Sequence, residues 1–263
     1  MVSTGIATGK IILSGEYAMA FGFSGIAFPS RETMRVRFRP TRKGGLTVIF
    51  KPDDFHPEWA MYAGQAAECI ARHADIQLRG ELSVDTDLPL GKGMGSSTAL
   101  VIAVARALLG KDCREAALAA EDEMNPGHSG MDFSVIWEGR PILFRKGSTP
   151  TPVTLPSSLP KHVTLIDAGM PNEQTPVLVA WVKSRGSELE KPLQIIGACT
   201  ERILSGEDLK TVLRDHHRAQ VALGVVPSHA QTIVEGIERH GGAAKVIGAG
   251  GRTGGGGMIL ALH

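Results

Sequence analysis

The sequence has few cysteines, almost no net charge and no long apolar run, and each shortage excludes a class of protein. The cysteines at 69, 113 and 199 are far apart and lack Cys-x-x-Cys spacing, which argues against a disulfide framework or a zinc site. With 28 Lys and Arg against 27 Asp and Glu, no overall field favours nucleic acid or an anionic membrane. Neither a membrane span nor a signal-peptide pattern is present. We therefore expect a soluble, unprocessed cytoplasmic protein that binds neither nucleic acid nor membrane.

The length of 263 residues is enough for one large or two modest domains of mixed helix and strand. The stretch from Gly147 to Pro160 is rich in proline and serine and has no hydrophobic period, which is typical of a connection. We place a domain boundary there, with one domain over residues 1–148 and a second over residues 149–263.

Hydrophobic periodicity predicts both strands and helices along the chain. The alternation in Met34–Arg39 and Leu46–Phe50, around Lys43-Gly44-Gly45, predicts a hairpin. The run Met131–Trp137 is expected to be a strand. Further strands are predicted over Gly5–Leu13, Leu78–Val84, Pro141–Phe144, Val163–Ile166, Ala244–Ile247 and Met258–Leu262, with helices over Pro57–Ala74, Ala99–Leu109, Cys113–Met124, Pro176–Lys183, Lys191–Leu204, Asp208–Leu223 and Ser228–His240.

The most informative stretch is the glycine-rich loop Leu88–Thr98, which runs directly into the apolar segment Ala99–Leu109. Glycines at alternate positions leave backbone amides uncovered, and the serines and threonine that follow open a helix whose dipole favours an anion. The loop is neither a Walker A sequence nor a dinucleotide fingerprint. It predicts a phosphate cradle; the alternative is a strand-to-helix turn whose serines only cap the helix.

An acidic end is expected on the helix Cys113–Met124, whose last turn carries Glu121, Asp122 and Glu123. Carboxylates at a helix C-terminus oppose the dipole, so a nearby cation would stabilise them. Glu121 shares the helix face of Ala117 and Leu118. Asp122 and Glu123 are expected to be surface acids.

Four segments together resemble the GHMP kinases, the superfamily named for galacto-, homoserine, mevalonate and phosphomevalonate kinases. Gly9–Ala18 is similar to the first motif of mevalonate kinases, and Leu90–Ala99 to the second. Ser129-Gly130-Met131-Asp132 is similar to the signature of the catalytic aspartate, and Gly248–Gly257 corresponds to the third motif. The motifs extend along the whole chain in the family's order, which is hard to obtain by chance.

The resemblance implies an α+β fold of two domains, the N-terminal half like ribosomal protein S5 domain 2 and the C-terminal half ferredoxin-like. It implies phosphoryl transfer from ATP with Mg²⁺, and these roles: catalytic Asp132 and Lys10; metal ligands Ser97 and Glu121; ATP-binding Gly91, Lys92, Gly93, Met94, Gly95, Ser96, Ser97 and Thr98; substrate-binding Glu16, Tyr17, Gly250 and Gly251. A small-molecule alcohol is the implied partner, and a homodimer is left open.

The chemistry that the resemblance implies needs a cradle for phosphate oxygens, a divalent metal, a cation near the reacting centre and a carboxylate at the attacking hydroxyl. Amides of Gly93, Gly95 and Ser96 would hold phosphate. Asp132 would accept or orient the hydroxyl proton, and Lys10 would keep Asp132 anionic.

Each of these residues also has an ordinary structural explanation when taken alone. Lys10 fits a solvated strand residue, Glu121 a surface acid and Asp132 the start of a strand. Arg252, in the third glycine loop (the third motif, Gly248–Gly257), fits a mobile surface arginine. The pair His216-His217, and His56, fit solvated faces, since no metal-ligand spacing involves them.

The acceptor is less clear than the family. Tyr17 stands where mevalonate kinases usually have histidine, which is closer to phosphomevalonate kinases, and Arg252-Thr253 expands the third loop. Asn125–Asp132 and Gly139–Pro141 look more like mevalonate kinases. The hypothesis is therefore phosphorylation of the primary alcohol of mevalonate in isoprenoid precursor synthesis. The alternatives are phosphomevalonate kinase, another sugar or alcohol kinase of the superfamily, and a non-catalytic nucleotide-binding regulator.

Overall fold

The computed structural model describes residues 1–51, 57–155, 159 and 163–263, and these residues fall into two units. Unit 1 contains Met1–Lys10, Pro29–Leu90 and Gly95–Gly139; unit 2 contains Ile11–Phe28, Gly91–Met94 and Arg140–His263. The long strands β1 (Ser3–Ser14) and β2 (Ser24–Pro40) supply residues to both units. The division at residues 148 and 149 stays a prediction, and part of the connection around it lies outside the described residues, as does His56.

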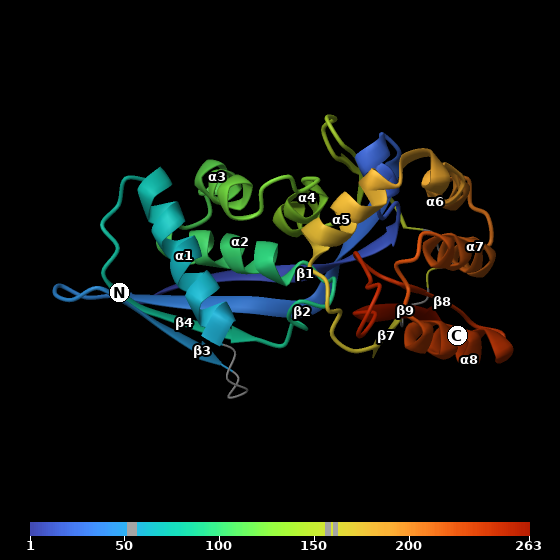
Figure 1. Cartoon of the computed structure of the whole chain (residues 1–263). Helices are drawn as coiled ribbons and strands as arrows, with labels where there is room; N and C mark the ends of the chain where they lie inside the picture. The colour runs from blue at the N-terminus through green and yellow to red at the C-terminus, as the bar shows by residue number, and fades with distance from the viewer. Residues whose placement is uncertain (52–56, 156–158, 160–162) are drawn as a thin grey trace. The chain divides into compact units, whose positions relative to one another are not determined.

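Unit 1 is a sheet with a layer of helices. Its sheet has β4 (Gly80–Thr86) between β3 (Leu46–Lys51) and β2, and β1 pairs with β2. The helices pack against one another as a layer on the sheet (Figure 1). They are α1 (Pro57–His73), α2 (Ser96–Leu109), α3 (Arg114–Met124) and α4 (Met131–Glu138).

Unit 2 is built on the antiparallel sheet β7-β9-β8, formed by Thr164–Asp167, Met258–Leu262 and Ala243–Val246. As an edge strand, β7 is half exposed. Elsewhere, Ser24–Ala27 of β2 pairs with β5 (Ile142–Arg145), which pairs with β6 (Thr151–Pro152). The helices are α5 (Thr175–Ser184), α6 (Glu190–Leu204), α7 (Leu209–Ala222) and α8 (Ser228–Arg239), with short 3₁₀ turns η1 (Ala18–Phe21) and η2 (Gly186–Leu189).

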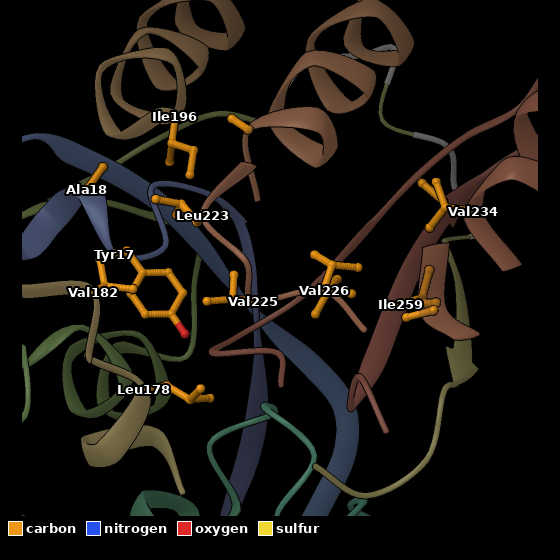
Figure 2. Packing of buried hydrophobic residues seen from close by; sticks show 14 of the residues in the cluster. Tyr17, Ala18, Leu178, Val182, Ile196, Leu223, Val225, Val226, Val234 and Ile259 are labelled. Carbon is orange, nitrogen blue, oxygen red and sulfur yellow. The ribbon is translucent and has the colours of Figure 1, made fainter. Parts of the chain in front are cut away.

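The core of unit 2 collects apolar side chains from helices, strands and loops. Figure 2 shows the ring of Tyr17 among aliphatic side chains that include Leu178, Val182 and Val225. Both α7 and α8 pack against β8. Burial of this kind stabilises the unit by about 25 cal/mol for each Å² of apolar surface removed from water.

The predicted hairpin between Met34–Arg39 and Leu46–Phe50 is wrong. Strand β4 lies between them, pairing antiparallel with β2 (Met34 opposite Thr86) and parallel with β3 (Leu46 opposite Gly80). Parallel neighbours need a long crossover, and α1 supplies it. The order strand–helix–strand was visible in the sequence and was the signal for this arrangement, whereas alternation alone identifies strands without their partners.

The predicted strand Met131–Trp137 is also wrong, because these residues form helix α4. Gly130 precedes the helix in a left-handed conformation (φ 87°), and the hydroxyl of Ser134 donates to the carbonyl of Gly130 at 2.7 Å. Short apolar runs fit a buried helix as well as a strand, and the pattern cannot separate them. The correction matters because it puts Asp132 in the first turn of a helix.

Candidate active site

The glycine-rich loop connects β4 to α2 and needs glycine for its backbone path. Gly91, Gly93 and Gly95 all have positive φ, at 68°, 85° and 73°, a region that side chains with a Cβ rarely adopt. Helix α2 begins at Ser96 and is buried along almost its whole length, as its single charged residue predicts. Its N-terminal turn, which favours an anion, is therefore held rigidly.

The first half of the loop is anchored within unit 2. The amide of Met258 donates to the carbonyl of Lys92 at 3.1 Å, and a Cβ on Gly93 would lie 2.6 Å from the carbonyl oxygen of Ile247. The ammonium of Lys92 pairs with the carboxylate of Asp167, and Met94 is fully buried. The side chains of Lys92 and Met94, both predicted to bind ATP, thus have protein partners.

Lys10 and Asp132 form the central ion pair of unit 1. The Nζ of Lys10, on β1, lies 3.3 Å from Oδ1 of Asp132, on α4; the lysine side chain is 3% exposed and the aspartate 36%. A buried ammonium is costly unless it is paired. Lys10 is therefore not the solvated strand residue of the alternative explanation. The carboxylate of Asp132 thus contacts the fixed ammonium of Lys10, and its exposed part can contact a ligand.

Glu121 lies at the end of α3 and is 2% exposed, despite its position in an acidic turn. The hydroxyl of Thr98 donates to its Oε1 at 2.7 Å, while Oε2 is buried without a hydrogen bond from the described residues. Burial raises the pKa of Glu121; Thr98, His128 and Asn125 lower it, and Asp132 raises it further. A buried carboxylate with one oxygen oriented and one unsatisfied fits a hard divalent cation.

Ser97, the other predicted metal ligand, directly precedes Thr98, whose hydroxyl donates to Glu121. Ser97 follows Ser96 in the first turn of α2 and is half buried. Tyr62 accepts a hydrogen bond from Asn125 at 2.9 Å, and its burial raises its pKa to about 12. The two neighbouring acids are surface residues, as predicted: Asp122 pairs with His128, and Glu123 with Arg72 and His73.

The predicted substrate residues Glu16 and Tyr17 lie in unit 2, where both are buried. The carboxylate of Glu16 pairs with Lys245 and lies 3.1 Å from Nε2 of His216. Burial raises the pKa of Glu16, but Lys245 and His216 together outweigh this effect and lower the pKa to about 2. The hydroxyl of Tyr17 donates to the carbonyl of Ala249, and burial raises its pKa above the usual range.

The predicted solvated position of His216 and His217 is wrong, since they are 0% and 6% exposed. The spacing of Leu209, Leu213 and His216 puts this histidine on the apolar face of α7, so helical periodicity was the signal. Lys245, also missed, is the one charged residue in the buried strand β8.

Gly250 and Gly251 allow the third loop to approach protein backbone. Gly250 has φ 67°, and a Cβ at this position would lie 2.2 Å from the carbonyl oxygen of Val225. The same carbonyl accepts a hydrogen bond from the amide of Gly251 at 2.9 Å. The inserted Arg252 is exposed, but its guanidinium lies 4.2 Å from the ring centre of Trp181. The amides of Arg252 and Thr253 donate to the carboxylate of Glu173, so this part of the loop is ordered by side chains.

Comparisons with known proteins were made for both the sequence and the fold. Residues 61–140 match the family model described as GHMP kinases N terminal domain. A mevalonate kinase of Thermococcus gammatolerans is 28% identical over 97% of this chain and 87% of its own length. The crystal structure of Methanococcus jannaschii mevalonate kinase has a TM-score of 0.82 at 18% identity, covering all of this chain and 90% of that one.

A phosphomevalonate kinase of Streptococcus pneumoniae, solved with phosphomevalonate and AMPPNP, has a TM-score of 0.74 at 15% identity over 98% of this chain and 91% of its own. At such identities the structures show the fold alone, and they confirm the predicted α+β class. None of the helices in the described residues is long and apolar enough to cross a membrane.

Proposed function

We propose that this chain is a GHMP kinase, a phosphotransferase with an alcohol group as acceptor, that its acceptor is mevalonate and that its donor is ATP bound with Mg²⁺. The observation that carries the proposal is the ion pair of Lys10 and Asp132, which lies in the same unit as the N-terminus of α2 and the buried Glu121. The reaction needs these groups: an anion site, a carboxylate at the nucleophile and a nearby cation.

In the proposed reaction, a bond forms between the acceptor hydroxyl oxygen and the γ-phosphorus, while the bond to the β–γ bridging oxygen breaks and ADP leaves. Asp132 orients the hydroxyl and receives its proton. Lys10 keeps Asp132 anionic and stabilises negative charge on the attacking oxygen. Amides of Gly93, Gly95 and Ser96 bind phosphate oxygens.

Ser97 and Glu121 are the proposed magnesium ligands, because a hydroxyl and a carboxylate are the hard donors that this ion prefers. When bound, Mg²⁺ would neutralise charge on the transferred phosphate. Thr98 holds one oxygen of Glu121, which leaves Oε2 as the donor toward the metal. The proposal thus gives a reason for an acid at the end of α3, where the helix dipole disfavours it.

Phosphomevalonate is the second candidate acceptor, on the single observation that Tyr17 follows Gly15-Glu16. A phosphorylated acceptor would need additional Arg or Lys side chains that converge on its phosphate. Tyr17 itself is buried against Ala249, so it is a poor candidate for such a contact.

The test is an ATP-coupled assay over mevalonate, mevalonate 5-phosphate, homoserine and galactose. We expect turnover with mevalonate above all others, and ATP consumption equal with and without mevalonate would contradict the proposal. Asp132→Asn should lower kcat by a factor of about 10²–10⁴, the usual contribution of general-base catalysis. The exposed Asp85, changed to Asn, is the matched control and should retain full kcat.

A further inference from the structure

The turn between β1 and η1 has a strained backbone. The amide of Ala18 donates to the carbonyl of Glu16 at 2.7 Å, closing a three-residue turn around Tyr17, which has φ 63° and ψ −46°. A γ-turn with positive φ is rare and strained, and a residue with a Cβ adopts it only where its surroundings enforce it. The side chains of Glu16 and Tyr17 show what enforces it here.

On one side of the turn, Glu16 is held by a buried cation, Lys245, and by a buried histidine, His216. Lys245 pairs with Oε1 of Glu16 and also donates to the carbonyl of Ile12 at 3.1 Å. His216 Nε2 lies 3.1 Å from Oε2 of Glu16 and 3.4 Å from the amide nitrogen of Gly15. All three ionisable side chains are at least 98% buried, so the geometry of this network is fixed by packing.

The amide of Gly15 donates to Nε2 of His216, and the same nitrogen lies against Oε2 of Glu16, so the imidazole contacts both residues that lead into the turn. His216 belongs to α7, and the packing of this helix fixes the position of its ring. In the same helix, Gln220 donates to the carbonyl of Val246 on β8 at 3.0 Å. His216 therefore ties the turn to α7 as Lys245 ties it to β8.

On the other side of the turn, the hydroxyl of Tyr17 donates to the carbonyl of Ala249, at the start of the third glycine loop. The Tyr17 ring lies in the apolar core of unit 2 (Figure 2). The strained turn is thus fixed at both ends: at Glu16 by Lys245 and His216, and at Tyr17 by the loop. Moving one end would move the other.

We propose that His216 is a positioning residue, which holds Glu16 so that the strained turn keeps Tyr17 on Ala249 and the third glycine loop in the shape that binds acceptor. The kinetic part of this inference rests on the proposed function; the structural part does not. His216 touches neither substrate nor nucleotide in this account, and it acts through Glu16 and Tyr17.

The structural test uses the fact that the chain has two tyrosines, Tyr17 and Tyr62. Protein labelled with 3-fluorotyrosine gives two ¹⁹F resonances, which Tyr62→Phe assigns. His216→Leu should shift or broaden the Tyr17 resonance and leave that of Tyr62 unchanged. His216→Gln, whose side-chain amide can both accept from the amide of Gly15 and donate toward Glu16, should restore the original spectrum. His217→Gln is the control, since this neighbouring histidine is also buried, and the structure, where it is described, gives it no hydrogen bond or ion pair with Glu16.

The kinetic test measures KM and kcat for mevalonate and ATP in the same variants. His216→Leu and Tyr17→Phe should each raise the KM for the acceptor about tenfold, as expected for one lost charge-assisted or buried hydrogen bond, with the KM for ATP changed less than threefold. His216→Gln should recover most of the loss. The inference would be overturned if the Tyr17 resonance were unchanged in His216→Leu. It would also be overturned if His217→Gln shifted that resonance as much as His216→Leu does. Absence of mevalonate turnover in the unmodified protein would instead refute the proposed function and leave the ¹⁹F test intact.

Discussion

At the scale of single residues, buried charge separates structural roles from candidate catalytic ones. Inside unit 2, the charge of Glu16 is compensated by Lys245, whereas Asp132 has an exposed side and Glu121 is buried with an unsatisfied oxygen and no ion pair among the described residues. Burial of a charge is costly unless it is compensated. The uncompensated oxygen of Glu121 and the open side of Asp132 are therefore where a ligand would lower the free energy most.

Thr98 provides a test of how Glu121 is oriented. Thr98→Val removes the 2.7 Å hydrogen bond to Oε1 and frees the carboxylate to rotate. We expect the Mg²⁺ concentration for half-maximal activity to rise several-fold, with a loss of about 1 kcal/mol in unfolding free energy. Magnesium titrations of activity measure the first effect. The control is Thr232→Val, which removes an exposed hydroxyl on α8; an equal shift in that variant would contradict the role of Thr98.

The buried His217 should make the folding stability of the protein depend on pH. Burial, and then the neighbouring cationic groups, lower its pKa from 6.5 to about 4 in the folded protein. As pH falls below 6.5 the unfolded chain binds this proton first, so stability is lost between pH 6.5 and about 4 and is complete above that window. The loss from this residue is about 3 kcal/mol.

Urea unfolding at several pH values between 4 and 7 measures this loss. His217→Gln should flatten the acid side of the stability profile, while the exposed His229→Gln should leave it as it is. An unchanged acid limb in His217→Gln would show that another group is responsible.

At the scale of elements, the glycine-rich loop leads into α2, and its last glycine, Gly95, can be tested against a matched one. Gly95 and Gly139 flank helices in the left-handed conformation, so alanine costs about 1–2 kcal/mol of stability at either. A Cβ on Gly95 would also lie 3.0 Å from Cγ of Lys10 and 3.2 Å from Cδ1 of Ile136, whereas one on Gly139 meets nothing within 4 Å.

Both Gly95→Ala and Gly139→Ala should therefore lower the melting temperature. Only Gly95→Ala should also lower kcat, because it displaces Lys10 from Asp132. Thermal unfolding together with steady-state kinetics separates the two effects. Equal kcat in both variants would mean that the position of Lys10 does not matter for the reaction.

The sequence predicted where most helices and strands lie better than it predicted which strands and side chains contact one another. Continuous apolar residues predicted that α2 is buried, and the resemblance to GHMP kinases implied that Lys10 and Asp132 lie together, as the structure has them. The partner of β3 and the helical state of residues 131–137 could not be obtained from alternation alone. The pairing of Glu16 with Lys245 spans 229 residues, and no local pattern encodes a contact at that separation.

At the scale of the whole molecule, the interleaving of the two units limits where the chain can be cut. A fragment of residues 149–263 contains Lys245 and His216 but lacks Glu16. Leaving a buried lysine without its carboxylate costs about 3–5 kcal/mol, a large part of the 5–15 kcal/mol that stabilises a typical domain. We expect this fragment to show no cooperative unfolding transition by circular dichroism. Adding a peptide of residues 11–28 should partly restore it, and cooperative unfolding of the fragment alone would contradict the expectation.

The three cysteines are all buried as free thiols: Cys69 in α1, Cys113 directly before α3, and Cys199 in α6. Because a thiol must reach solvent as a thiolate to react, alkylation of the native protein would proceed only through opening of the surrounding helix. Two of these thiols lie in unit 1 and one in unit 2. The alkylation rates of these native cysteines, measured separately, would therefore report how fast each unit opens, without any engineered probe.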